Sequence, residues 1–335
     1  MTFGPLGKLL VFPAIFTLIF FTENLQSQTD CDYSVPGETA HWIFGYQAAV
    51  NFVDGQPVNS QSIDYKFPNG MSVMSDSTGN LLFYTDGMYV WNRNHELMQN
   101  GQGLKGNNGA TQSCIIVPHP GDEDHYYIFT VSTIVPFLNE GFRYHEISMA
   151  ANNGLGAVVN KNELLLDGAT AEKLTAVQHS NWQDYWIITH GWGNTGGDSF
   201  YSFLLNENGL DSAYVTSQVG VFQSGDLPDR NEKGYMKVSP DGSKIALAIN
   251  GSGTLEILDF NRETGELSNP VSADGEIFNE IYGVEFSPDS RMLYYTTLRR
   301  GGAGLSGLYQ LDFSGLPDLN NTMMIAEYGP DSLMT

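Results

Sequence analysis

The sequence predicts an all-β protein, a β-propeller of four-stranded antiparallel blades. Five stretches repeat the same strand-turn-strand pattern, and a further strand follows each of them. Long amphipathic helical periods are absent outside the N-terminal segment. The 335 residues include 37 glycines, 17 tyrosines and 19 phenylalanines, a composition that suits strands joined by many tight turns.

The five copies can be laid over one another. In each, a short apolar strand leads into a turn of Ser, Pro, Asp, Asn or Gly, residues that pre-set or satisfy a turn backbone, and then into a second strand. A threonine recurs in the second strand, and Ala248 replaces it in the fourth copy. The copies span residues 71–86, 114–131, 174–190, 235–249 and 282–297, and the threonines are Thr85, Thr130, Thr189 and Thr296.

A third strand is expected after each copy, at residues 88–92, 142–149, 200–206, 255–260 and 308–313. A less regular fourth strand follows, for example at 157–166 or 323–328. Four strands that repeat at about 40–60 residues are the signature of a propeller blade. Apolar runs such as "KIALAI" need not alternate, because stacked blades bury both faces of their middle strands. A β-sandwich is the alternative, but it does not account for five copies of one pattern.

Residues 41–70 also resemble strands and are expected to open a further blade, while the last unit ends near Tyr328. We therefore expect five blades and a partial one, within a propeller of about six to seven blades. An open blade edge leaves backbone groups unpaired. Either the N-terminal strands close a six-bladed ring, or the chain is the front part of a longer protein.

Residues 1–28 are expected to be a signal peptide, and residues 29–335 the propeller domain. Lys8 precedes an apolar run over residues 9–21, which is shorter than the ~20 residues of a membrane span and contains Pro13. This predicts a secreted or cell-surface protein without membrane insertion after cleavage. Cys31 and Cys114 form neither a disulfide scaffold nor a zinc motif, and whether they pair is open.

The charge balance bears on the partners. With 38 acidic and 15 basic side chains, the formal net charge is −23. Nucleic acids and anionic membranes both attract clustered Lys and Arg, so neither is expected as a partner. We expect a soluble monomer.

Three segments carry a resemblance to a known family. "HWIFGYQAAVNF", "GNLLFYTDGMYVWNRNHELMQNGQGLKGNNGATQSCIIVPHPG" and "YYIFTV" resemble the N-terminal propeller of large secreted Bacteroidota surface proteins associated with gliding motility and type IX secretion. The resemblance covers roughly residues 41–330 and implies a propeller fold, an extracellular location and a part in a larger adhesin-like protein. The later units "SPDGSKIALA" and "FSPDSRMLYYT" are similar to Tyr-Val-Thr-Asn and Trp-Asp repeat propellers, including lactonase-like ones.

Common catalytic motifs are missing from the sequence. It contains no Gly-x-Ser-x-Gly, no His-Glu-x-x-His, no phosphate-binding Gly-Lys-Ser/Thr loop and no Rossmann fingerprint. His119 and His179 fall in equivalent turns and are interpreted as structural. The turn "PGDEDH" at residues 120–125 has the acidic groups that calcium prefers, but not the spacing of a loop that wraps the ion. No cofactor is predicted, and a calcium ion at this turn is the alternative.

Propeller topology indicates where a ligand should bind. The loops between second and third strands, and the connections between blades, open on one face around the central channel. Aromatic, amide and charged side chains at such a mouth suit a sugar or peptide. The candidate ligand-binding residues are Asp86, Gln112, Lys173, His190, Trp192, Asp198, Glu280, Arg299 and Arg300.

Two functions remain open. The preferred hypothesis is a non-enzymatic binding module for a glycan or protein ligand, with no catalytic residues. The alternative is a lactonase-like or glycan-lyase-like enzyme with a metal or a His/acid site at the channel mouth.

Overall fold

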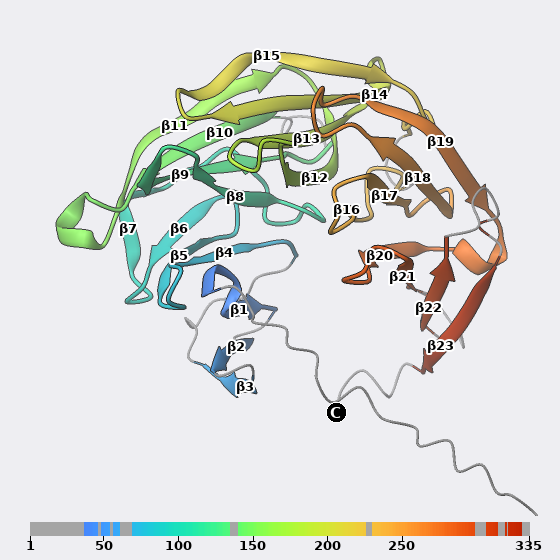
Figure 1. The fold of residues 1–335 in the computed structure, drawn as a ribbon, viewed down its shortest axis with the longest axis horizontal. Helices are drawn as coiled ribbons and strands as arrows, with labels where there is room; N and C mark the ends of the chain where they lie inside the picture. The colour runs from blue at the N-terminus through green and yellow to red at the C-terminus, as the bar shows by residue number, and fades with distance from the viewer. Residues whose placement is uncertain are drawn as a thin grey trace, which may run out of the picture. The chain divides into compact units, whose positions relative to one another are not determined.

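The computed structural model describes residues 37–45, 48–53, 56–60, 69–134, 140–225, 230–298, 306–313, 319 and 321–329. All of them belong to one compact unit, Val35–Thr335. Strands β1 to β23 make up nearly all the regular structure, beside the short 3-10 helices η1 (Gly37–Thr39), η2 (Asn152–Gly154) and η3 (Glu276–Phe278) (Figure 1). No helix within these ranges is long and apolar enough to cross a membrane.

The first sheet has three antiparallel strands, β1 (His41–Phe44), β2 (Ala48–Val53) and β3 (Gln56–Asn59), and we call it the N-terminal sheet. These strands confirm the expectation of strands within residues 41–70, of which residues 46–47, 54–55 and 61–68 lie outside the described ranges. Ile43 and Ala49 point from this sheet into a cluster with Tyr84 and Trp91 of the next one. The N-terminal sheet therefore packs through one face on the first complete blade.

The described strands that follow form five four-stranded antiparallel blades in chain order, and the first two blades join through their outermost strands into one eight-stranded sheet. Blade 1 contains β4 (Ser72–Ser75), β5 (Leu81–Thr85), β6 (Tyr89–Asn92) and β7 (Leu97–Gln102). Blade 2 contains β8 (Cys114–His119), β9 (Asp122–Thr130), β10 (Phe142–Ser148) and β11 (Ala157–Leu166). Blade 3 contains β12 (Thr170–Gln178), β13 (Tyr185–Trp192), β14 (Thr195–Asn206) and β15 (Gly209–Gln218). Blade 4 contains β16 (Met236–Val238), β17 (Lys244–Ile249), β18 (Thr254–Phe260) and β19 (Leu267–Asp274). Blade 5 contains β20 (Ile281–Phe286), β21 (Met292–Thr297), β22 (Ser306–Asp312) and β23 (Thr322–Tyr328).

The first strands of successive blades lie side by side. β4 contacts β8, β8 contacts β12, β12 contacts β16, and β16 contacts β20, while β1 lies against β4 (Figure 1). Within the described ranges, outermost strands pair only between blades 1 and 2, where Gln99 of β7 forms a parallel bridge with Ala157 of β11. Sheets arranged around a common set of inner strands define a β-propeller, so the predicted fold class is confirmed.

Hydrophobic clusters between neighbouring blades explain the unbroken apolar runs. Phe83 of blade 1 packs with Ile128 of blade 2, and Ile187 of blade 3 packs with Phe129 of blade 2. The recurring threonines lie near the ends of the second strands. Thr85 Oγ1 donates to the backbone oxygen of Tyr89 at 2.7 Å, so the hydroxyl ties one strand to the next inside the blade.

The turn between first and second strands uses one device in all five blades. A side-chain acceptor receives the backbone N–H two residues further on, as Asp76 Oδ1 does from Thr78 at 2.9 Å and His179 Nδ1 from Asn181 at 3.1 Å. Such bonds fix a tight turn. The acceptors are Asp76, His119, His179, Asp241 and Asp289. The structural interpretation of the two histidines is confirmed.

Candidate functional site

We name the two faces of the propeller by their loops. The connection face carries the loops from second to third strands and the links between blades. The turn face carries the turns from first to second strands. The sequence places its candidate residues on the connection face, and the structure brings two of them, Lys173 and His190, into one buried polar cluster.

Asp86, on the connection face, accepts hydrogen bonds from groups around its own turn. It is fully buried, and its Oδ1 accepts hydrogen bonds from the backbone N–H groups of Met88 and Tyr89 at 2.9 and 2.8 Å. Asn108 Nδ2 donates to Oδ2 at 3.2 Å. Burial raises the pKa of the Asp86 carboxyl, against these hydrogen bonds. The side chain closes the turn between β5 and β6.

Gln112 joins three blades. Its Nε2 donates to the backbone oxygens of Leu174 in β12 and Met236 in β16, at 2.9 and 3.1 Å. Its Oε1 accepts from the backbone N–H groups of the same two residues, at 3.4 and 2.7 Å. The side-chain amide of Gln112, which lies in the connection into blade 2, therefore bridges the backbones of β12 and β16 at the inner edges of blades 3 and 4.

The remaining candidates are dispersed. Trp192 is buried at the end of β13. Asp198 is partly exposed, and its Oδ2 accepts from Gln218 Nε2 at 2.8 Å. Glu280 is half-buried, and its backbone oxygen accepts from the N–H of Leu298 at 3.0 Å. Arg299 and Arg300 lie outside the described residues.

The buried cluster lies at the junction of blades 3 and 4 and centres on Lys173, which is fully buried. Its Nζ donates to the backbone oxygens of Glu232 and Lys233 at 3.1 and 3.2 Å. The neighbouring Glu172 is also buried, and its Oε2 accepts from the N–H and Oγ1 of Thr111 at 2.7 and 3.0 Å. The Lys173 amine thus donates to backbone carbonyl oxygens, and the carboxyl side chains of Glu172, Glu232 and Glu256 lie around it.

Glu256 supplies the charge from blade 4. It is fully buried, and its Oε1 accepts from the backbone N–H of Val221 at 2.9 Å. Gly220 has φ +89°, and a Cβ there would lie 2.8 Å from Oε2, so the carboxylate needs this glycine. Burial raises the pKa of Glu256 to about 7 and lowers the pKa of Lys173 to about 7. Both groups therefore change protonation near neutral pH.

Several polar atoms around this junction lack a hydrogen-bond partner among the described residues. They include both carboxylate oxygens of Glu232, Oε2 of Glu256, both amide atoms of Gln223, and Nε2 of His190. His190 Nδ1 lies 2.7 Å from the backbone oxygen of Gly191, and burial lowers the pKa of the imidazole to about 3, so it is neutral. Each buried polar group without a partner costs about 1–3 kcal/mol. The unpartnered polar groups of the cluster therefore lower the stability of the fold. Lys173 and Glu256 can bind and release protons near neutral pH, but the side chains of the cluster are buried away from solvent.

No metal site is evident in the part of the chain that the structure describes: no group of three or more His, Cys, Asp or Glu side chains is placed to hold an ion. In the acidic turn at residues 120–125, Asp122 Oδ1 accepts from the N–H of Asp124 at 3.0 Å. Cys114 is a buried free thiol whose pKa burial raises to about 12, while Cys31 lies outside the described residues.

An open groove of about 1000 Å³ lies on the turn face, across blades 1, 2 and 3. Its floor is apolar, with Met74, Leu82 and Met149. Its walls are aromatic and charged. The wall residues include Tyr126, Trp182, Tyr185, Glu38, Glu123, Asp124 and Arg93.

Trp182 is the most exposed of the large hydrophobic side chains that the structure describes, at 65%. The Arg262 guanidinium lies 4.0 Å from the centre of its indole ring, a cation–π contact. Nε and Nη2 of Arg262 donate to the backbone oxygens of Gln178 and His179 at 2.9 and 3.1 Å, which holds the guanidinium in place. Trp182 also lines the groove, and most of its side chain stays exposed despite the contact with Arg262.

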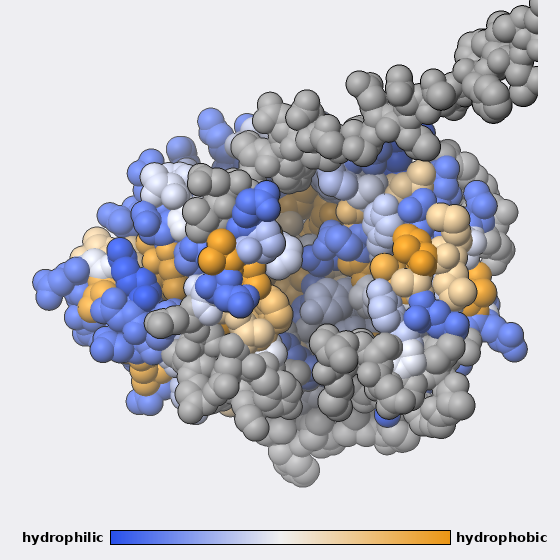
Figure 2. Space-filling view, turned by 90° about the horizontal axis from the view of Figure 1, so that it is seen from below, coloured by the Kyte–Doolittle hydropathy of each residue, from blue (hydrophilic) through white to orange (hydrophobic). Residues whose placement is uncertain are grey.

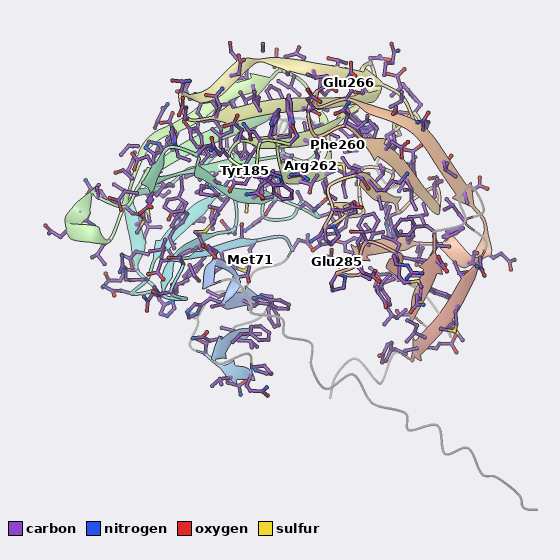
Figure 3. All side chains as sticks on the ribbon, viewed as in Figure 1. Met71, Tyr185, Phe260, Arg262, Glu266 and Glu285 are labelled. Atoms are coloured by element: carbon purple, nitrogen blue, oxygen red, sulfur yellow. The ribbon has the colours of Figure 1, made fainter. Side chains whose placement is uncertain are left out.

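Figure 3 labels Tyr185, at the start of β13, and Arg262, in blade 4. The sequence did not predict a site in this region, because its residues come from three separate turns. The one signal in the sequence was a tryptophan within the polar turn "HSNWQD", residues 179–184.

These features define the class: the chain is a β-propeller protein with four-stranded blades. It is similar to two solved structures of putative 6-phosphogluconolactonases, from Bacteroides uniformis and Bacteroides fragilis, each with 12% identity and a TM-score of 0.50. The alignments cover 84% of this chain and 78% and 76% of those chains. A β-propeller domain from Myceliophteria thermophila is 7% identical with a TM-score of 0.45, over 88% of both chains.

At these identities the likeness concerns the fold alone. No family model matches the chain, and no curated protein is similar to it by sequence.

Proposed function

We propose that this propeller is a non-enzymatic binding module and that the groove on the turn face takes a glycan. The supporting observation is Trp182, whose largely exposed side chain lines the groove. The flat C–H face of a sugar ring stacks on such a surface. Carboxylates such as Glu123 and Asp124 accept hydrogen bonds from hydroxyl groups, and a few polar groups around an apolar floor are typical of small-molecule sites.

The test starts from a glycan array, and the affinity for each bound glycan is then measured by calorimetry. Trp182→Ala should weaken binding at least tenfold, because the stacking surface is lost. Phe222→Ala is the matched control, since Phe222 is also an exposed aromatic residue, at 55%, but lies in the link from blade 3 to blade 4 on the connection face. An equal loss in both variants, or unchanged binding by Trp182→Ala, would contradict the proposal.

We also propose that the protein acts outside the cell, secreted or on the cell surface, as a monomer or as the propeller of a larger adhesin-like protein. The apolar run over residues 9–21 supports export. Mass spectrometry of the exported chain should find an N-terminus near residue 28. A chain that keeps Met1 in the cytoplasm would contradict this.

A second candidate is an enzyme of the lactonase kind. It is supported by the fold likeness to the two putative 6-phosphogluconolactonases and by Lys173 and Glu256, whose pKa values lie near neutral pH, although a substrate would reach these two buried groups only after an opening of the cluster. The wild-type protein would then hydrolyse a lactone faster than buffer, and Glu256→Gln would abolish the difference. A wild-type rate equal to that of buffer removes this candidate and leaves the glycan proposal untouched.

A further inference from the structure

One face of blade 5 is not covered by any of the sheets that the structure describes. The second strands β5 and β17 are buried from their second residue to their last, since a blade packs on each side. In β21 buried and half-buried residues alternate instead. Leu293 and Tyr295 point into the cluster with blade 4, whereas Tyr294 and Thr296 point to the other side. That outward face continues through Leu308 and Gln310 of β22 to Met323 of β23, which is 59% exposed.

The N-terminal sheet has a similar uncovered face. Ile43 and Ala49 pack on blade 1, so their neighbours in the strands point away from it. Trp42 and Phe44 are 54% and 47% exposed on that side. Trp42 contacts Phe52 of β2 edge to face, with ring centres 5.0 Å apart. Two half-apolar sheet faces therefore stand at the two ends of the series of blades.

A hollow of about 230 Å³ lies at the inner edge of this face, lined by Tyr294, Thr296 and Leu308 of blade 5 and by Tyr235 and Lys237 of blade 4. At its rim, Lys237 Nζ and Glu285 Oε2 form an ion pair at 2.9 Å, so the charged groups beside the hollow are matched. Figure 3 labels Glu285 at the inner end of blade 5. A space of this size and polarity suits one aromatic side chain.

Figure 2 shows the side of the molecule on which the first and last sheets lie. Hydrophobic side chains appear on both sides of a central hollow. Exposed apolar patches of this kind usually mark an interaction surface.

We propose that the outward face of the N-terminal sheet docks on the outward face of blade 5, with Trp42 in the hollow, and closes the ring at six sheets. Every other sheet interface among the described strands is of this face-to-face type. Because both faces belong to one chain, docking has the advantage of a high effective concentration. A second copy is a weaker occupant, since a net charge of −23 on each chain opposes self-association.

Hydroxyl-radical footprinting of the full chain tests this closure. Met323 and Tyr294 should be protected from oxidation in the wild type, and Trp42→Ala should raise their oxidation rates severalfold. Trp182→Ala is the matched control, because it removes an exposed tryptophan from the turn face and should leave both rates unchanged. Equal rates in the wild type and Trp42→Ala would overturn the proposal. Protection that increases with protein concentration would also overturn it, since the occupant would then be a second copy.

A covalent test guards against misfolding of Trp42→Ala. Phe44→Cys and Met323→Cys are combined in a chain that carries Cys31→Ser, and a bis-maleimide reagent is added. The proposal expects a cross-link within the monomer, seen as a peptide joining β1 to β23, and none in either single variant. Cross-linked dimers, or two cysteines that react separately, would overturn it. Neither residue belongs to the groove, so glycan binding is tested independently.

Discussion

At the scale of single residues, burial acts in opposite directions on Lys173 and Glu256. It disfavours the charged form of each, which lowers the pKa of the amine and raises the pKa of the carboxyl. The hydrogen bonds of the two groups go to the backbone, since Lys173 donates to carbonyl oxygens and Glu256 accepts from the N–H of Val221. Burying these two groups therefore lowers the free energy of unfolding and brings both pKa values close to 7.

We expect Glu256→Gln to change the pH dependence of stability. Burial raises the pKa of Glu256 from its ordinary value of 4.5 to about 7, so between these two pH values the folded carboxyl holds a proton that the unfolded chain has lost. The stability that this bound proton gives the folded state is therefore fully present below pH 4.5. It is lost as the pH rises from 4.5 to about 7, so the free energy of unfolding of the wild type falls over this range. Glutamine does not titrate, so the variant should gain on the order of 2 kcal/mol relative to wild type between about pH 5 and about pH 7.5.

Urea denaturation at the two pH values measures this difference. Glu163→Gln, at an exposed position of β11, is the control and should shift stability by less than about 0.5 kcal/mol at either pH. A difference between wild type and Glu256→Gln that does not vary with pH would show that Glu256 titrates normally.

At the scale of strands and turns, side chains replace missing backbone partners. Gln112 provides two donor and two acceptor contacts to the inner strands of blades 3 and 4. The acceptors of the first turns, such as Asp76 and Asp241, do the same within single blades. The propeller depends on these amides and carboxylates where blades diverge and strand pairing ends.

We expect Gln112→Ala to lower the free energy of unfolding by about 2–4 kcal/mol, because it leaves buried backbone groups of Leu174 and Met236 without the amide. Thermal and urea denaturation measure the loss. Gln102→Ala, at an exposed position of β7, serves as the control with little expected effect. If Gln112→Ala instead abolishes glycan binding while stability is unchanged, Gln112 has the ligand-binding role predicted from the sequence.

At the scale of the whole molecule, aspartates in the first turns of three blades should make the stability of the fold depend on pH in the acid range. Burial alone would raise the pKa of Asp76, but hydrogen bonds from Thr78 and Asn80 outweigh it and lower the pKa to about 2. The pKa values of Asp241 and Asp289 are lowered as well, by hydrogen bonds from Ser239 and Ser287. Depressed carboxyl pKa values give stability that is present above the unfolded pKa and lost as the pH falls through the folded one.

The melting temperature should therefore drop between about pH 4 and about pH 2, and the triple variant Asp76→Asn, Asp241→Asn, Asp289→Asn should show a shallower drop. Asparagine keeps an acceptor oxygen for each turn but does not titrate. Differential scanning calorimetry across this range measures the slope. Identical slopes would mean that other carboxyl groups dominate acid unfolding.

Much of the fold could be predicted because a propeller is a local repeat. The strand at residues 157–166 has the predicted limits, and the second strands end near the recurring threonines. Turn chemistry and apolar runs act within a few residues, so the sequence displays them directly. The candidate ligand-binding residues on the connection face were harder to predict, because the position of a residue near a loop does not reveal whether its side chain is buried. Asp86 and Gln112 had the expected polarity, but the structure places them within hydrogen-bond networks.

The sequence by itself determined the class of fold, the order of the strands and the expectation of export, because these follow from short-range patterns of apolar, turn and charged residues. Only the tertiary structure showed that Lys173, Glu232 and Glu256 share one buried junction, although 83 positions separate Lys173 from Glu256 (256 − 173). It alone also assembled the groove around Trp182 from turns of three blades. The physical reason is that such sites arise where blades pack together, and the packing of distant segments leaves no pattern in any one of them.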